Sequence, residues 1–116
     1  MPIVDVELVG APAADGLAQR LADDIGSVLG APPGKVWVRV HTLSANRYAE
    51  NGGNAPFPVF VTVLSSAPPE GEALDNRVAR ITAAVASLTD RDPAHVHVLF
   101  EPSARGRMAF GGRVVK

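Results

Sequence analysis

The feature that most constrains the fold of this chain is an internal repeat. The segment Pro33–Val38 stands 60 positions before Pro93–Val98, with the proline and both valines matched. A proline also opens the first apolar strand of each half, at Pro2 and at Pro58, which lie 56 positions apart. Self-similarity of this kind indicates tandem duplication of one structural unit.

The length of the chain sets the scale of that duplication. A chain of 116 residues suits one domain, which can bury a core while much of its surface stays exposed. We therefore interpret residues 1–116 as a single domain with an internal repeat, whose copies are residues 2–57 and 58–116.

The first copy is predicted to form a strand, a helix and a second strand. Apolar residues alternate along Pro2–Val9, which is the pattern of a half-buried strand. From about Ala14 to Leu29 they recur about every 3.6 residues, with Asp15 as the expected N-cap and Gly30 placed to end the helix. Alternation returns over Lys35–Leu43 and predicts the second strand.

The second copy repeats this pattern after a polar, Gly/Asn-rich connection over Ser44–Pro56. A strand is predicted over Pro58–Leu64, and an amphipathic helix over Glu72–Leu88, closed by Asp92-Pro93. A fourth strand is predicted over His95–Phe100.

Two such units define an α+β fold. Each β-α-β copy needs a right-handed crossover, which places both helices on one face of a four-stranded mixed sheet. The opposite face is expected to carry a mixture of aromatic and charged side chains, namely Trp37, Arg39, His41, His95 and His97. We expect other subunits to close over that face.

Composition supports such an assembly and excludes several classes of partner. Hydrophobic residues make up 47% of the chain, and mean hydropathy is +0.13, which suggests apolar surface buried between subunits. A net charge of −1 gives no electrostatic footprint for nucleic acid or anionic membranes. The chain has no cysteine and no apolar run long enough to span a membrane. A cytoplasmic location is therefore expected.

Pro2 is the position that points to chemistry. Initiator methionine is normally removed before proline, which would leave Pro2 as a secondary amine at the end of a sheet. An α-amino group has a reference pKa of about 7.7–8.0, which burial or cationic neighbours lower towards neutrality. Such a group can accept a proton at one carbon and return it at another, which is general acid/base catalysis.

Three stretches together resemble the tautomerase superfamily. They are the start Pro2–Val6, the helix-to-strand junction Gly30–Val38 and the closing segment Ser103–Gly112. The resemblance covers essentially the whole chain and is greatest for the two-unit members, which include macrophage migration inhibitory factor and 5-carboxymethyl-2-hydroxymuconate isomerase. Shorter relatives resemble 4-oxalocrotonate tautomerase.

The resemblance implies a function as well as a fold. It implies a keto–enol tautomerase that acts on a small enol or 2-oxo acid, with Pro2 as general acid/base and without metal or cofactor. It also implies a homotrimer whose sites lie between subunits, near Pro2, where cations hold a substrate carboxylate. Pro58 is internal and has no basic nitrogen, so one site per subunit is expected.

Substrate-binding residues follow from the same resemblance: Arg39, His97, Arg105, Arg107, Tyr48 and Phe110. His97 matches the position at which two-unit members supply a polar side chain to a neighbouring subunit. A structural role is the alternative for each residue. Arg39 could form an interface ion pair, the two loop arginines could be solvated, and His97 and the two aromatic residues could simply pack between subunits.

The sequence also departs from the family pattern. Ala31 replaces the lysine that members similar to macrophage migration inhibitory factor carry before Pro-Pro, and Leu64-Ser65-Ser66 lacks the arginines of dehalogenase and decarboxylase members. Simple tautomerisation is therefore favoured over those reactions. Two alternatives stay open, namely a non-catalytic ligand-binding or scaffold protein of the same fold, and a metal site at His95-x-His97, for which no third ligand lies nearby.

Overall fold

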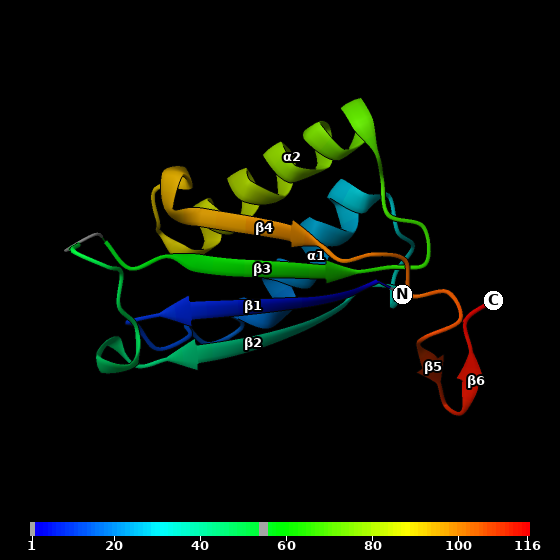
Figure 1. Cartoon of the computed structure of the whole chain (residues 1–116), viewed down its shortest axis with the longest axis horizontal. Helices are drawn as coiled ribbons and strands as arrows, with labels where there is room; N and C mark the ends of the chain where they lie inside the picture. The colour runs from blue at the N-terminus through cyan, green and yellow to red at the C-terminus, as the bar shows by residue number, and fades with distance from the viewer. Residues whose placement is uncertain (1, 54–55) are drawn as a thin grey trace.

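The computed structural model describes residues 2–53 and 56–116. Two strand–helix–strand units follow one another (Figure 1): β1 (Ile3–Val9), α1 (Leu17–Leu29), β2 (Trp37–Leu43), then β3 (Val59–Leu64), α2 (Gly71–Thr89), β4 (Val96–Phe100). Short 3₁₀ turns, η1 (Ala45–Arg47) and η2 (Pro93–His95), precede β3 and β4. Part of the predicted connection over 44–56 lies outside the described residues, at positions 54 and 55.

The four long strands form one mixed sheet in the order β2-β1-β3-β4. Within each unit the two strands are parallel, and the units join through the antiparallel pair β1 and β3. This arrangement confirms the predicted four-stranded mixed sheet. A separate two-stranded hairpin, β5 (Ala109–Phe110) and β6 (Arg113–Val114), lies beyond the sheet at the end where β1 begins (Figure 1).

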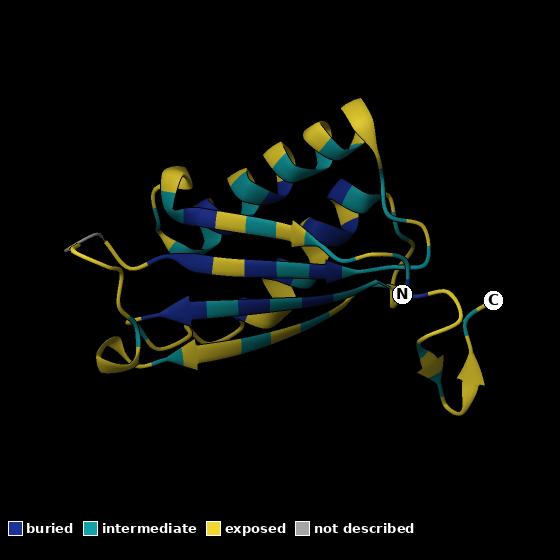
Figure 2. Cartoon of the chain, viewed as in Figure 1, coloured by how far each residue is buried: buried dark blue, intermediate teal, exposed yellow. Residues whose placement is uncertain are grey.

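The core lies between the sheet and the two helices, which cover the same face. Burial alternates along the strands, as Figure 2 shows for β1 and β3, because successive side chains point to opposite faces. Burying one such Val, Leu or Ile side chain contributes about 1.5–3 kcal/mol. The sheet contributes Val4, Val6, Leu8, Val59, Val61 and Val63 to this core, and the helices contribute Leu21, Ile25, Ile81 and Val85.

The ends of α1 differ in how well the sequence predicts them. The helix begins at Leu17 rather than near Ala14, and Asp15 is not its N-cap. Gly16 takes that position in a left-handed conformation (φ 76°), without a side-chain cap. At the other end Gly30 (φ 65°) stops the helix as predicted, because glycine adopts this conformation without a steric penalty. The N–H of Ala31 then donates to the carbonyl of Gly26 over 3.0 Å, which satisfies an end carbonyl.

The end of α2 also needs a correction. The helix stops at Thr89, before Asp92-Pro93, because Asp90 adopts a left-handed conformation (φ 54°). Asp92 instead caps η2, accepting a hydrogen bond of 2.8 Å from the N–H of Ala94. His95 therefore belongs to η2 and not to β4, which begins at Val96.

The helix-free face of the sheet is only partly the one predicted. Trp37, Arg39 and His41 point away from the core along β2, and His97 does so on β4. His95 lies in η2 and not in β4, so the pair His95-x-His97 does not share one strand. In the part of the chain that the structure describes, no helix is long and apolar enough to cross a membrane.

Candidate functional site

Pro2 lies at the start of β1, half-buried, beside a cavity of about 370 Å³. Its carbonyl accepts a hydrogen bond of 3.0 Å from the N–H of Trp37, which fixes it at the beginning of the β1–β2 ladder. Met1 lies outside the described residues, and its removal stays a prediction.

The sheet topology explains what surrounds Pro2. Because β3 runs antiparallel to β1, Ile3 pairs with Leu64 at the end of β3, and Val63 pairs in turn with Phe100 at the end of β4. The cavity beside Pro2 is therefore built where one strand begins and two others end. Its apolar walls are Leu29, Val63, Ala67 and Phe100, and Ser65 and Ser66 follow β3 on its rim.

Two cationic residues also line this cavity, Lys35 and Arg77. The predicted site included neither of them. Lys35 comes just before β2, and the pairing of Ile3 with Trp37 brings this segment next to Pro2. A parallel register between the first two strands could therefore have indicated that Lys35 lies near Pro2. Arg77 lies on α2, four residues before the buried Ile81, so the amphipathic pattern of this helix could have placed Arg77 towards the sheet side.

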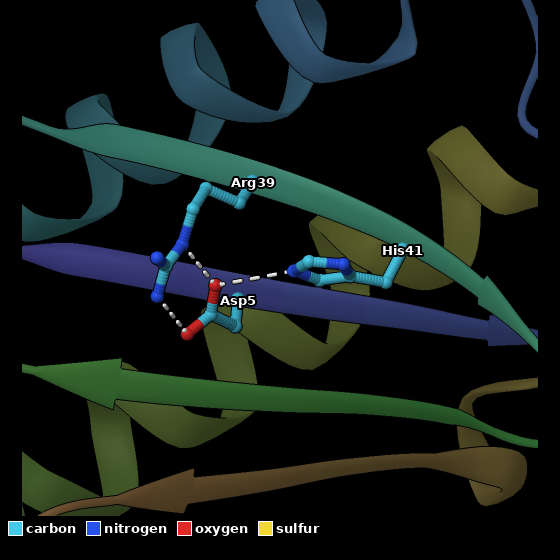
Figure 3. Close-up of polar contacts among 3 residues, drawn as sticks. All are labelled: Asp5, Arg39 and His41. Atoms are coloured by element: carbon cyan, nitrogen blue, oxygen red, sulfur yellow. Dashed lines mark hydrogen bonds and ion pairs between the residues drawn. The ribbon is translucent and has the colours of Figure 1, made fainter.

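Arg39 lies elsewhere, in an ion pair on the helix-free face (Figure 3). Its Nε and Nη2 donate to the two carboxylate oxygens of Asp5, over 2.6 and 2.8 Å. The two residues are direct neighbours in the β1–β2 register. His41, two residues along β2, places its Nε2 3.7 Å from the same carboxylate. This arrangement is the structural alternative considered for Arg39, formed here within one chain.

Asp5 and Arg39 shift each other's pKa. The hydrogen bond from Arg39 is the main cause that lowers the pKa of Asp5, with partial burial opposing it and His41 adding a smaller effect. The hydrogen bond with Asp5 in turn raises the pKa of Arg39. The Arg39 side chain is 63% exposed, so solvent screens the pair and its contribution to stability is small.

Arg105 and Arg107 lie in the exposed turn that leads to β5. The backbone N–H of Arg105 donates to Ser103 Oγ over 3.2 Å. Arg107 lines a second cavity, of about 520 Å³, together with Asp5 and Glu101. Within one subunit, the cavity beside Pro2 is lined by neither of these two arginines.

The aromatic candidates separate to opposite ends of the sheet. Phe110 packs edge-on against Trp37, with ring centroids 5.2 Å apart, and so lies at the end where Pro2 is found. Tyr48 packs against Phe60, and Phe60 packs against His97, with centroids 6.2 and 5.6 Å apart. Since Phe60 pairs with Glu7 near the far end of β1, Tyr48 and His97 lie at the end of the sheet away from Pro2.

Tyr48 has a further polar contact. Its hydroxyl donates to a carboxylate oxygen of Glu50, and this hydrogen bond raises the pKa of Tyr48. Over residues 2–53 and 56–116, no group of three or more His, Cys, Asp or Glu side chains is arranged to hold a metal ion.

Comparison with known proteins finds similar folds among solved structures. No protein-family model matches the sequence, and no curated protein matches it either. Among solved structures, native fused 4-OT superposes with a TM-score of 0.81 at 21% identity, over 97% of this chain and 94% of that one. The macrophage migration inhibitory factor of Trichinella spiralis gives a TM-score of 0.77 at 14% identity, over 97% and 98% of the two chains. The chain has the tautomerase-superfamily fold.

A third structure with this fold is an enzyme of another reaction class. FG41 malonate semialdehyde decarboxylase, inhibited by 3-bromopropiolate, superposes with a TM-score of 0.71 at 19% identity, over 94% of this chain and 88% of that one. The resemblance seen in the sequence is thus confirmed for the fold. At these identities the fold alone is shared, and the reaction has to be argued from the residues of this chain.

Proposed function

We propose that this chain is a tautomerase of the amino-terminal proline type, which isomerises a small enol or 2-oxo acid. The observation that carries the proposal is the position of Pro2, half-buried in the lining of a cavity that has apolar walls and two cationic residues. Within the described chain, that lining contains no carboxylate. Proton transfer next to a substrate carboxylate requires a basic amine to move the proton, apolar walls to exclude water and a positive charge to hold the carboxylate.

The proposed reaction needs Pro2 as a free secondary amine, and therefore the loss of Met1. Positive neighbours and a partly desolvated position favour the neutral amine, since both disfavour a further positive charge on the Pro2 nitrogen. The neutral nitrogen takes the enol proton of the substrate, and the resulting ammonium returns a proton to carbon. The charge that develops on the substrate oxygen is stabilised by the cations and hydroxyls of the cavity.

A homotrimer is part of the proposal. Fused 4-OT with this fold is described as a symmetric trimer and as an asymmetric trimer. In this chain three large apolar side chains of the helix-free face are unusually exposed: Trp37 at 49%, Phe60 at 37% and Leu99 at 56%. Closure of subunits over this face would bury them. It would also let His97, Tyr48, Arg39 or the loop arginines of one subunit reach the Pro2 cavity of the next.

Covalent labelling of the amine tests the proposal directly. Pt0534, which has this fold at a TM-score of 0.81 and 19% identity, is inactivated by 2-oxo-3-pentynoate. With this chain, the neutral Pro2 nitrogen should add to the alkyne carbon β to the ketone, and the triple bond should become a double bond that gains the amine proton. Mass spectrometry of untagged protein should show one reagent per chain, located on Pro2, together with loss of phenylenolpyruvate tautomerisation.

The same experiment can favour the alternative function. Protein that has lost Met1, remains unlabelled and does not turn over phenylenolpyruvate or 2-hydroxymuconate would point to a non-catalytic ligand-binding protein of this fold. Retention of Met1 in natively expressed protein would have the same meaning, because the Pro2 nitrogen would then be an amide.

A further inference from the structure

Arg77 is a half-buried cation on the wall of the Pro2 cavity. It lies in the second turn of α2 and shares the cavity lining with Ser65, Ser66 and Ala67, which follow β3. Its Nη1 donates to the side-chain oxygen of the neighbouring Asn76 over 2.9 Å. That partner is neutral, and no carboxylate in residues 2–53 or 56–116 forms an ion pair with Arg77. The charge of Arg77 is therefore available to a ligand in the cavity.

The other candidate arginines differ from Arg77 in this respect. Arg39 already holds Asp5 through two hydrogen bonds, and a ligand would have to compete with that carboxylate. Arg107 shares its cavity with two acidic residues, Asp5 and Glu101, which also disfavour an anion there. Arg77 lines a cavity that has Lys35 as a second cation and no acidic residue among its described lining.

The rest of the lining leaves room for a ligand beside Arg77. Ala31 lines the same cavity, and its small apolar side chain brings no competing charge.

We propose that Arg77 binds the carboxylate of the ligand in the Pro2 cavity and so selects anionic over neutral ligands. The inference deepens the proposed function and rests on it for the identity of the site. Partial burial strengthens a charge-assisted hydrogen bond, and the planar guanidinium can hold both oxygens of a carboxylate at once. Arg77 therefore suits this role better than Lys35, which is exposed and presents a point charge.

Binding of an inert ligand pair tests the inference without any turnover. Cinnamate and cinnamamide have the same planar shape and differ in charge, and their dissociation constants can be measured by calorimetry or NMR titration. Arg77→Ala should weaken cinnamate binding by about tenfold or more, about 1.4 kcal/mol, since it removes a hydrogen bond between two charged groups. Binding of cinnamamide should stay unchanged.

Matched variants separate charge from shape. Arg77→Lys should recover part of the cinnamate affinity, because it keeps the charge and loses the planar fork. Arg80→Ala removes an exposed arginine from the same helix, outside the cavity lining, and should change neither constant. Melting temperatures of all variants check that α2 is intact.

Three outcomes would overturn the inference: unchanged cinnamate binding in Arg77→Ala, equal losses for the two ligands, or no cinnamate binding by the wild-type protein at millimolar concentration. Failure of the proposed function looks different. Protein that binds cinnamate through Arg77, yet is not labelled at Pro2 and turns over no enol acid, would refute catalysis and leave the role of Arg77 in binding standing.

Discussion

The guanidinium of Arg39 holds the carboxylate of Asp5 across two parallel strands, with hydrogen bonds of 2.6 and 2.8 Å. The pair lies on the helix-free face, outside the cavity that contains Pro2. Its geometry gives Asp5 a pKa below the ordinary value, with the hydrogen bond from Arg39 as the largest cause. The pair therefore links the stability of the sheet to pH.

The first prediction concerns that link. Because the folded-state pKa of Asp5 is lowered, the stabilisation is fully present above the unfolded-state pKa, about 3.9, and is lost as pH falls through the lower folded-state value. Asp5→Asn should therefore lower the melting temperature slightly at pH 6, and the difference from wild type should shrink as pH falls below 4. Asp75→Asn, at an exposed position on α2, is the matched control. A difference that grows at low pH would contradict this account.

The second prediction concerns Arg91, which follows α2. Its Nη1 donates to the carbonyl of Phe57 over 2.6 Å, and its Nη2 donates to the carbonyl of Val9 over 2.8 Å. One side chain thus ties the end of α2 to the end of β1 and to the chain entering β3. Arg91→Ala should destabilise the fold by about 1.5–3 kcal/mol, since it removes charge-assisted hydrogen bonds and leaves two carbonyls without this donor.

Urea unfolding checks this value, with Arg80→Ala as a surface control expected to stay within about 0.5 kcal/mol of wild type. Arg91→Lys should lose less than Arg91→Ala, because an ammonium can still reach a carbonyl. Equal stability of wild type and Arg91→Ala would show that the hydrogen bonds of Arg91 do not stabilise the fold.

The strands were predictable because their signal is local. Alternation along β1 and β3 fixes which side chains face the helices, and both parallel pairs follow from the crossover rule. Helix ends were less predictable. Gly16 rather than Asp15 is the N-cap of α1, and the turn capped by Asp92 takes His95 out of β4, because short-range backbone geometry competes with the wider pattern.

The candidate site was predictable only in part. Pro2 lines a cavity at one end of the sheet, whereas Tyr48 and His97 lie at the other end of the same sheet. Lys35 and Arg77 line the cavity and were missed. The position of Arg77 depends on the rotation of α2 against the sheet, which is set by the packing of Ile81 and Val85 in the core.

The third prediction is a homotrimer that depends on the helix-free face. Leu99 is 56% exposed on β4 in the isolated chain, and its burial between subunits would stabilise the assembly. Leu99→Asp should dissociate the trimer, because it places a charge in an apolar contact. Ala79→Asp, at an exposed site on α2, should leave the oligomer intact. Light scattering at micromolar concentration measures both, and a stable wild-type monomer would remove the inter-subunit part of the proposal.

The fourth prediction separates the cations by their effect on catalysis. A residue that grips the carboxylate equally in the ground and transition states changes mainly KM when removed, and one that meets the developing enolate changes kcat. With phenylenolpyruvate, Arg77→Ala should raise KM. We expect at least one of Arg39→Ala, Arg105→Ala and Arg107→Ala to lower kcat/KM by about tenfold, about 1.4 kcal/mol, if trimer closure brings it to a neighbouring cavity. Wild-type kinetics in all three would exclude these arginines from the site.

The last prediction concerns the nitrogen of Pro2. Untagged protein should lose Met1 and turn over an enol acid, and the rate should fall by roughly 10²–10⁴-fold in Pro2→Ala, as is typical when a general acid/base is removed.

An added N-terminal residue should have at least as large an effect, because it converts the amine into an amide without changing the side chains of the cavity. Pro58→Ala is the internal comparison: the nitrogen of Pro58 is already an amide, so this substitution should affect stability rather than turnover. Equal activity in tagged, untagged and Pro2→Ala proteins would refute catalysis by the amine, because no step of the proposed reaction proceeds without it.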